Sequence, residues 1–180
     1  MSDLTPRIYV ACLASYNAGR LYGCWIDLGE GIDEDDIRAE VSDMLSSSPE
    51  PIAEEWRIDA SEDLDGYCPE SLAEAAALGA LVDTYGKAAI HWFQNGSTDG
   101  LEPDEWGDKF TEEYQGHHDS PEAFIENLLE ENGLGRVLEA IQIGHSNAWA
   151  YLDAKAIAHD WMISDYFDIR DDGGHYIYRR

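Results

Sequence analysis

DGLEPDEWGDKFTEEYQGHHDSPEAFIENLLEENG, residues 99–133, has the apolar spacing of two helices whose remaining positions are mostly acidic. Pro103 suits the first turn of the first helix, because its missing N–H and its fixed φ match that position. Trp106, Phe110 and Tyr114 follow at intervals of four residues, which places them on one side of a helix. We therefore predict that these three side chains face the core from a single helix.

The second helix of this stretch is predicted to begin at Ser120, a good N-cap followed by proline, and to end at Asn132-Gly133. Its outward side carries Glu122, Glu126 and Glu130 at intervals of four residues. Like charges at this spacing destabilise a helix by a few tenths of a kcal/mol each. We infer that these glutamates have a role other than stability. The residues expected on the buried side are Phe124, Ile125, Leu128 and Leu129.

Acidic residues predominate along the whole chain. It contains 38 acids and 11 bases, a formal net charge of -27 with a pI near 4.1. A surface of this charge repels polyanions, so we expect neither nucleic acid nor an anionic membrane as a direct partner. Six Trp, ten Tyr and four Phe argue for a folded core and against a disordered acidic chain. The expected partner is a basic protein surface.

The cysteines and the N-terminal segment indicate the compartment. Cys12, Cys24 and Cys68 are an odd set without a C-x-x-C pair, so the sequence predicts neither a disulfide framework nor a zinc site. Residues 1–19 lack a basic segment followed by a long apolar core, the pattern of a signal peptide, and no apolar run approaches about 18 residues, the length of a membrane span. We expect a soluble, cytoplasmic protein.

Residues 1–60 are expected to form an antiparallel ββαβ unit. Two strands within residues 7–28 flank an Asn-Ala-Gly turn. Asp33 is a good N-cap for a helix over about residues 34–46, whose apolar positions recur at helical spacing. The segment EEWRID, residues 54–59, suits a third strand.

Residues 61–102 are expected to form a central helical domain. A helix opened at Ser71 runs to about Tyr85, where Gly86 provides a stop. The apolar segment KAAIHWFQ, residues 87–94, is predicted to be a second helix.

Residues 103–180 are expected to form a C-terminal α+β domain. After the two acidic helices, residues 136–144 fit a helix or a strand, and residues 153–164 fit a helix. Residues 166–170 and 175–179 flank an Asp-Asp-Gly-Gly segment, which predicts a β-hairpin. The predicted fold class is therefore α+β, with three small domains.

No catalytic constellation is found in the sequence. Residues 144–148, GHSNA, resemble a G-x-S-x-G nucleophile elbow only superficially, because no buried strand precedes them. His117-His118-Asp119 lacks the partners of a zinc site, so we expect a solvated turn. The acidic clusters lie on expected helix faces and do not fit a glycine-turned calcium loop. We predict no catalytic residue, no metal site and no cofactor.

The remaining feature is the geometry of the charge. Duplex DNA carries about one charge per 1.7 Å of its axis, so an excess of 27 negative charges matches the phosphates of about 13 base pairs. A folded surface of this density fits a DNA-binding groove, where carboxylates pair with the Lys and Arg that bind phosphates. A merely solvated acidic surface explains the same composition. The charge pattern selects these candidate partner-binding carboxylates: Asp33, Glu34, Asp36, Glu40, Asp43, Glu62, Asp63, Asp65, Glu70, Glu74, Asp104, Glu105, Asp108, Glu112, Glu113, Asp119, Glu122, Glu126, Glu130 and Glu131.

Several segments follow the pattern of a known family. Near the start these are PRIYVACLASYN (6–17), GRLYG (19–23) and WID (25–27). Further along they are EEW (54–56) and YQG (114–116), followed by AHD, YF and the Gly-Gly hairpin near the end. Over nearly its whole length the chain resembles the ArdA antirestriction proteins.

This resemblance implies a non-enzymatic DNA mimic, encoded on mobile elements, that binds in the DNA-binding groove of the methyltransferase core of type I restriction-modification enzymes. Incoming DNA then escapes cleavage. The resemblance also implies an elongated molecule of three small domains that forms a homodimer through the C-terminal domain. The family's antirestriction motif would lie near residues 128–141. The segment HHDS, residues 117–120, departs from the family pattern. The implied dimer-interface residues are Leu128, Leu129, Leu134, Val137, Leu138 and Ile141.

Two other functions remain compatible with the composition. An acidic halophilic housekeeping domain would unfold in low salt. A small metal-dependent hydrolase would lose turnover after a single His or Ser substitution, whereas a DNA mimic would lose activity gradually as several acids are neutralised.

Overall fold

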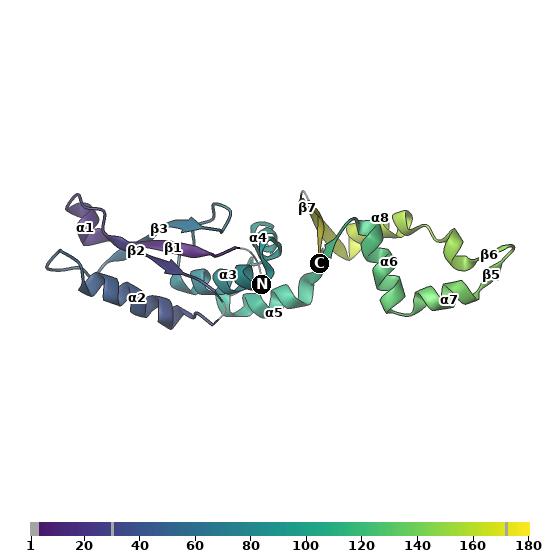
Figure 1. Cartoon of the computed structure of the whole chain (residues 1–180), viewed down its shortest axis with the longest axis horizontal. Helices are drawn as coiled ribbons and strands as arrows, with labels where there is room; N and C mark the ends of the chain where they lie inside the picture. The colour runs from purple at the N-terminus through teal and green to yellow at the C-terminus, as the bar shows by residue number, and fades with distance from the viewer. Residues whose placement is uncertain (1–3, 30, 172) are drawn as a thin grey trace. The chain divides into compact units, whose positions relative to one another are not determined.

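The computed structural model describes residues 4–29, 31–171 and 173–180. Its contacts divide the chain into two compact units, Met1–Phe110 (the N-terminal unit) and Thr111–Arg180 (the C-terminal unit). Their helices and strands are drawn in Figure 1. The fold is α+β, as predicted, with small antiparallel sheets and helices in both units. The division into three domains stays a prediction.

The N-terminal unit contains a three-stranded sheet. Its strands are β1 (Arg7–Cys12), β2 (Gly23–Asp27) and β3 (Trp56–Glu62), in the order β2-β1-β3. Both neighbouring pairs are antiparallel. The two strands predicted within residues 7–28, and the third strand after the helix, are therefore confirmed.

Two details of this sheet differ from the prediction. A short helix, α1 (Leu13–Asn17), follows β1 where a simple turn was expected. The buried Ser15 of α1 lies with its hydroxyl oxygen 3.2 Å from that of Ser48, and this tertiary contact favours the helical turn. Strand β3 runs beyond the predicted end at Asp59, because it follows β1 as far as the pair Arg7↔Glu62.

One helix covers the buried face of this sheet. Helix α2 (Glu34–Ser46) has the predicted bounds and contacts β1 and β2. At its start, the Asp33 side chain accepts the N–H of Asp36, whose side chain accepts the N–H of Asp33 in return. The fully buried Ile8 and Val10 of β1 lie on the same core. The buried residues of α2 are Ile37, Val41 and Met44.

The central helices also follow the prediction. Helix α3 (Leu72–Tyr85) and helix α4 (Lys87–Gln94) are joined at Gly86, whose φ of 59° is a conformation that glycine adopts without strain. A 3-10 turn, η1 (Pro103–Glu105), then leads into helix α5 (Trp106–Glu113).

Aromatic rings fill the core between these helices. The fully buried rings of Trp92 and Phe110 meet edge to face with their centroids 5.5 Å apart. Tyr85 packs on Phe110 at 4.7 Å, and Phe93 packs on Trp106 at 5.2 Å. Such pairs contribute about 0.5–1.5 kcal/mol beyond the area that they bury. They attach α5 to α3 and α4.

Gly79 of α3 lies where the helix packs against Leu28. A Cβ at residue 79 would be 2.4 Å from the Cβ of Leu28. We expect Gly79→Ala to lower the free energy of unfolding by about 1–3 kcal/mol, as overpacking does. Gly107→Ala on α5 is the matched control, because no atom lies within 4 Å of its Cβ, and it should stabilise by about 0.5–1 kcal/mol. Urea unfolding measures both changes, and a stabilising Gly79→Ala would contradict the packing.

Two helices of the C-terminal unit confirm predictions. They are the helix expected to begin at Ser120 and the helix expected over residues 153–164. Residues 136–144, which fitted a helix or a strand, contain the end of one helix and one short strand. No helix within the described ranges is long and apolar enough to cross a membrane. The elements are α6 (Pro121–Glu131), α7 (Leu134–Ala140), β5 (Gln142–Ile143), β6 (Ser146–Asn147), η2 (Ala148–Tyr151) and α8 (Ala154–Ser164).

A second three-stranded sheet has the order β4-β8-β7. The predicted hairpin is confirmed as β7 (Tyr166–Asp171) and β8 (Gly174–Arg179); Asp172 of its turn lies outside the described residues. Strand β4 (Tyr114–His118) pairs antiparallel with β8 and was not predicted. Its partner lies about 60 residues further along the chain, so no local periodicity indicates it.

Strand β4 corrects two predictions. Tyr114 does not continue the helix of Trp106 and Phe110; it opens the strand and packs on Tyr178 of β8, with the ring centroids 5.6 Å apart. His117 and His118 are not part of a solvated turn, because they belong to the same strand. The favourable pairing with β8 outweighs the four-residue apolar spacing.

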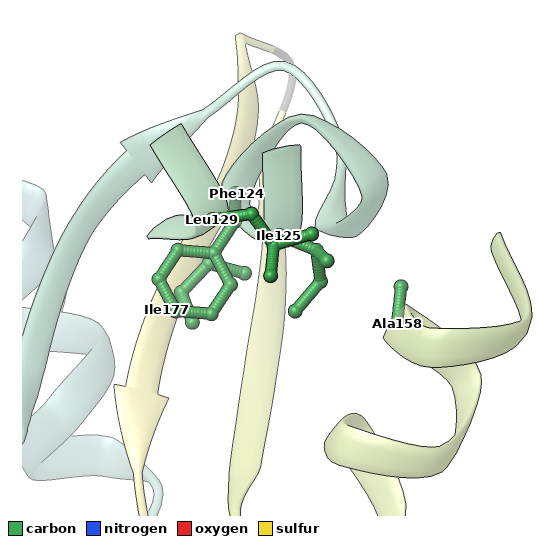
Figure 2. Packing of buried hydrophobic residues seen from close by; sticks show 5 residues of the cluster. All are labelled: Phe124, Ile125, Leu129, Ala158 and Ile177. Carbon is green, nitrogen blue, oxygen red and sulfur yellow. The ribbon is translucent and has the colours of Figure 1, made fainter. Parts of the chain in front are cut away.

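The core of the C-terminal unit lies between α6, α8 and β8. Figure 2 shows Phe124, Ile125 and Leu129 of α6 gathered near Ile177 of β8, with Ala158 approaching from α8. Phe124 and Ile125 are 3% and 0% exposed. The predicted apolar side of α6 therefore faces the core. The half-buried residues packed around it include Leu128, Ile157, Trp161 and Met162.

Candidate interaction surface

The twenty carboxylates selected from the charge pattern lie mostly on the surface. Sixteen are exposed, whereas Glu34, Glu74 and Glu122 are half-buried. Glu113 is only 9% exposed, because it lies on the inner side at the end of α5. Its carboxylate is therefore not presented to a partner.

Each unit is acidic by itself. The N-terminal unit has 24 acids and 6 bases, a net charge of -18, and the C-terminal unit has 14 acids and 5 bases, a net charge of -9. Both units therefore attract basic surfaces and repel polyanions.

Asp36, Glu40 and Asp43 form an exposed row along α2, here called the α2 acid stripe. Their spacing of four and three residues keeps them on one side of the helix, and a rise of 1.5 Å per residue spreads them over about 10 Å. One strand of DNA carries a phosphate about every 3.4 Å of axis. The charge spacing is of the same order. The other side of α2 buries Ile37 and Val41, which fixes the direction of the stripe.

Glu122, Glu126 and Glu130 form a second row on α6, here called the α6 acid stripe. Successive members are one turn apart, which corresponds to about 6 Å along the axis. Phe124 and Ile125 are buried on the opposite side. The stripe is therefore held on a helix that cannot rotate without exposing its core side.

Glu122 has a local structural role as well. Its pKa is lowered mainly because the carboxylate accepts a hydrogen bond from its own backbone N–H, and then because Ser120 donates to it. Electrostatic interactions with Lys155 and His175 act in the same direction. Ser120 also accepts the backbone N–H of Ala123 at 3.1 Å and so caps the helix.

The lowered pKa predicts a pH dependence. A carboxylate with a folded pKa below its unfolded pKa of about 4.3 contributes stability above that pH and loses it as the pH falls through the folded pKa. The loss of unfolding free energy caused by Glu122→Gln should therefore be largest at neutral pH and shrink in acid. Glu126→Gln controls for the removal of one negative charge from α6. Urea unfolding between neutral pH and about pH 3 measures this; a pH-independent effect of Glu122→Gln would contradict it.

Other selected carboxylates have partners within the chain. Arg38 pairs with Glu34 one turn away on α2, and Arg7 pairs with Glu62 across β1 and β3. Their charges are partly offset, so they contribute less to the field of the surface. Other members whose side chains accept a hydrogen bond include Asp33, Asp36, Asp63, Asp65, Glu74 and Glu105.

Helix α7 exposes an apolar face. Leu134, Val137 and Ile141 are 47%, 53% and 46% exposed. Their spacing of three and four residues places them on one side of the helix and its C-cap. These three residues are called the α7 apolar face below. Nearby, the Tyr151 hydroxyl donates to the Ile143 carbonyl at 3.5 Å, and both residues are also exposed.

The other residues implied for the dimer interface lie elsewhere. Leu129 is 8% exposed and belongs to the core of its own unit, and Leu128 packs against that core. Leu138 is half-buried. Ile143 and Tyr151 were not selected from the sequence, because residue type alone does not distinguish an exposed apolar side chain from a buried one.

No metal-binding cluster is found in the ranges that the structure describes. No group of three or more His, Cys, Asp or Glu residues there is arranged to hold a metal ion. His118 is hydrogen-bonded through Nε2 to the Gln115 carbonyl at 3.1 Å, and the His117 ring packs on Tyr176. Ser146 lies in the short β6 hairpin strand, which is not the strand-to-helix turn of a nucleophile elbow.

Comparison with known proteins gives one clear result. A family model described as Antirestriction protein (ArdA) matches residues 8–176. The match includes both units and both acid stripes. No curated protein matches the chain.

Proposed function

Because the chain belongs to the ArdA family of antirestriction proteins, we propose that it occupies the DNA-binding groove of a type I restriction-modification enzyme in place of DNA. The members of this family are non-enzymatic DNA mimics that inhibit type I restriction enzymes. The groove in question is that of the methyltransferase core. Its occupation keeps incoming mobile DNA from being bound and cleaved.

The observation that carries this proposal is the pair of acid stripes on α2 and α6. The α2 acid stripe is exposed, and so are Glu126 and Glu130 of the α6 acid stripe, whereas Glu122 is half-buried. Each stripe lies on a helix with a buried opposite side and repeats its charges every few ångströms. Contacts with phosphates supply much of the affinity of proteins for DNA, and they do not read the sequence. Carboxylates that pair with the same Lys and Arg side chains replace those contacts with charge-assisted hydrogen bonds.

We also propose that the protein is a homodimer paired through the α7 apolar face, with Ile143 and Tyr151 beside it. Exposed apolar residues that gather on one face mark an interaction site. A two-fold interface places the same face of both copies in contact and buries these residues twice. The dimer carries twice the acidic surface of one chain.

Cleavage of unmodified plasmid DNA by a purified type I restriction enzyme tests the proposed function. We expect the protein to inhibit cleavage when it is equimolar with the enzyme, and added duplex DNA to relieve the inhibition. Transfer of methyl groups is measured in parallel, because the same groove serves both reactions. Full cleavage in the presence of a tenfold molar excess of the protein would contradict the proposal.

A further inference from the structure

A pocket of about 250 Å³ lies where α6, α7 and η2 meet in the C-terminal unit. Its lining residues are Glu130, Gly135, Arg136, Glu139 and Trp149. Gly135 lies on the pocket wall, where a Cβ would be in van der Waals contact with Cγ of Glu130 at 3.4 Å and with the Trp149 ring at 3.7 Å. The pocket thus combines an aromatic ring with two carboxylates and one guanidinium.

The charged groups of this pocket have no partners within the described residues. Glu130, Arg136 and Glu139 form neither an ion pair nor a side-chain hydrogen bond there, and all three are exposed. Two carboxylates and one guanidinium give the pocket a net charge of -1. It can therefore neutralise one cationic group from another molecule.

The pocket and the α7 apolar face lie on different sides of the helix. Successive helix residues are rotated by about 100°, which places Arg136 and Glu139 roughly opposite the α7 apolar face. A second copy bound to the apolar face therefore leaves the pocket open to a different partner.

We propose that this pocket accepts the guanidinium of one Arg side chain from the target enzyme. The inference rests on the proposed function, in which basic side chains of the enzyme contact the acidic surface. It adds one specific binding pocket to that surface. Trp149 lines the pocket, so we expect the cation to stack on its ring and to form two parallel hydrogen bonds with the carboxylate of Glu130 or Glu139.

The chemistry of the pocket favours Arg over Lys. A guanidinium is planar, so it stacks on an indole while its edge donates to a carboxylate. An ammonium group is compact and strongly hydrated, and it loses more hydration when it enters a pocket beside a ring. The neighbouring Arg136 offsets one carboxylate without occupying the ring face in the structure, since no cation–π contact joins Arg136 to Trp149 among the described residues.

Titration of the full chain with methylguanidinium chloride tests the pocket directly. Two-dimensional NMR resolves the indole N–H signals of the six tryptophans, and Trp149→Phe identifies the signal of Trp149. We expect this signal to shift and saturate with methylguanidinium, and to shift much less with methylammonium chloride at the same concentration. Glu130→Gln/Glu139→Gln should remove the saturable shift. Equal shifts with both cations, or a saturable shift retained in the double variant, would overturn the proposal.

Binding to a purified type I methyltransferase tests the role of the pocket in target recognition. Glu130→Gln/Glu139→Gln should raise the Kd about tenfold, the value of one charge-assisted hydrogen bond. Asp160→Asn/Asp165→Asn removes two exposed acids of the same unit that lie outside the pocket and both acid stripes, and it should raise the Kd only about twofold. Equal changes in Kd for the two double variants would contradict a specific role of the pocket and would leave the proposed function intact. If the wild-type protein does not bind the methyltransferase, the proposed function itself fails.

Discussion

Raising the NaCl concentration from 50 to 200 mM should weaken binding of this protein to a type I methyltransferase by up to about 10³-fold, the loss found when a protein makes about six phosphate contacts. The α2 and α6 acid stripes supply six carboxylates for such contacts. Each ion pair formed with the enzyme releases ions that had screened the two surfaces, so added salt opposes binding. Fluorescence anisotropy of the labelled protein at several salt concentrations measures the slope.

A pair of variants separates the position of the charges from their number. Asp36→Asn/Glu40→Gln/Asp43→Asn removes the α2 acid stripe and should make the salt slope shallower. Asp27→Asn/Glu54→Gln/Glu55→Gln removes three exposed acids that lie outside the selected set and brings the net charge to the same value. If binding followed net charge alone, the two variants would have equal slopes, and the stripe would have no special role.

Val137→Asp should convert the protein to a monomer. Val137 is at the centre of the α7 apolar face and is 53% exposed in a single chain, so the substitution costs little in the free monomer. In a dimer paired through this face the new carboxylate would be buried without a partner, which costs several kcal/mol. We therefore expect the dimer Kd to rise at least about 100-fold. Analytical ultracentrifugation over a range of protein concentrations measures it.

Ile163→Asp is the matched control for this prediction. Ile163 lies on α8 and is 65% exposed, outside the α7 apolar face. The same substitution there should leave the dimer Kd unchanged. Dimers of equal strength in both variants would show that another surface holds the copies together, and a wild-type chain that remains monomeric at high concentration would exclude the dimer.

The elements that the sequence predicted well have strong local signals. The Asp33 cap defines the start of α2, Gly86 separates α3 from α4, and the Gly-Gly segment indicates the final hairpin. The outward direction of the α6 acid stripe follows from the apolar residues between its members. In each case the deciding residues lie within about one turn or one hairpin of each other.

The features that the sequence did not predict depend on distant contacts. Strand β4 forms because β8 pairs with it, and the four-residue spacing that ends at Tyr114 suggested a longer helix. The ion pair between Arg7 and Glu62 joins residues 55 positions apart, so charge counting treated Glu62 as unpaired. Similarly, the burial of Glu113 and the exposure of Val137 follow from how the elements pack.

Competition with DNA tests the central claim most directly. A fluorescently labelled duplex that contains the recognition site is bound to a purified type I methyltransferase, and the protein is titrated into the complex. If the acid stripes occupy the DNA-binding groove, the duplex will be released completely, and the apparent affinity of the protein will fall in proportion to added duplex. A ternary complex, in which the duplex stays bound while the protein also binds, would contradict DNA mimicry.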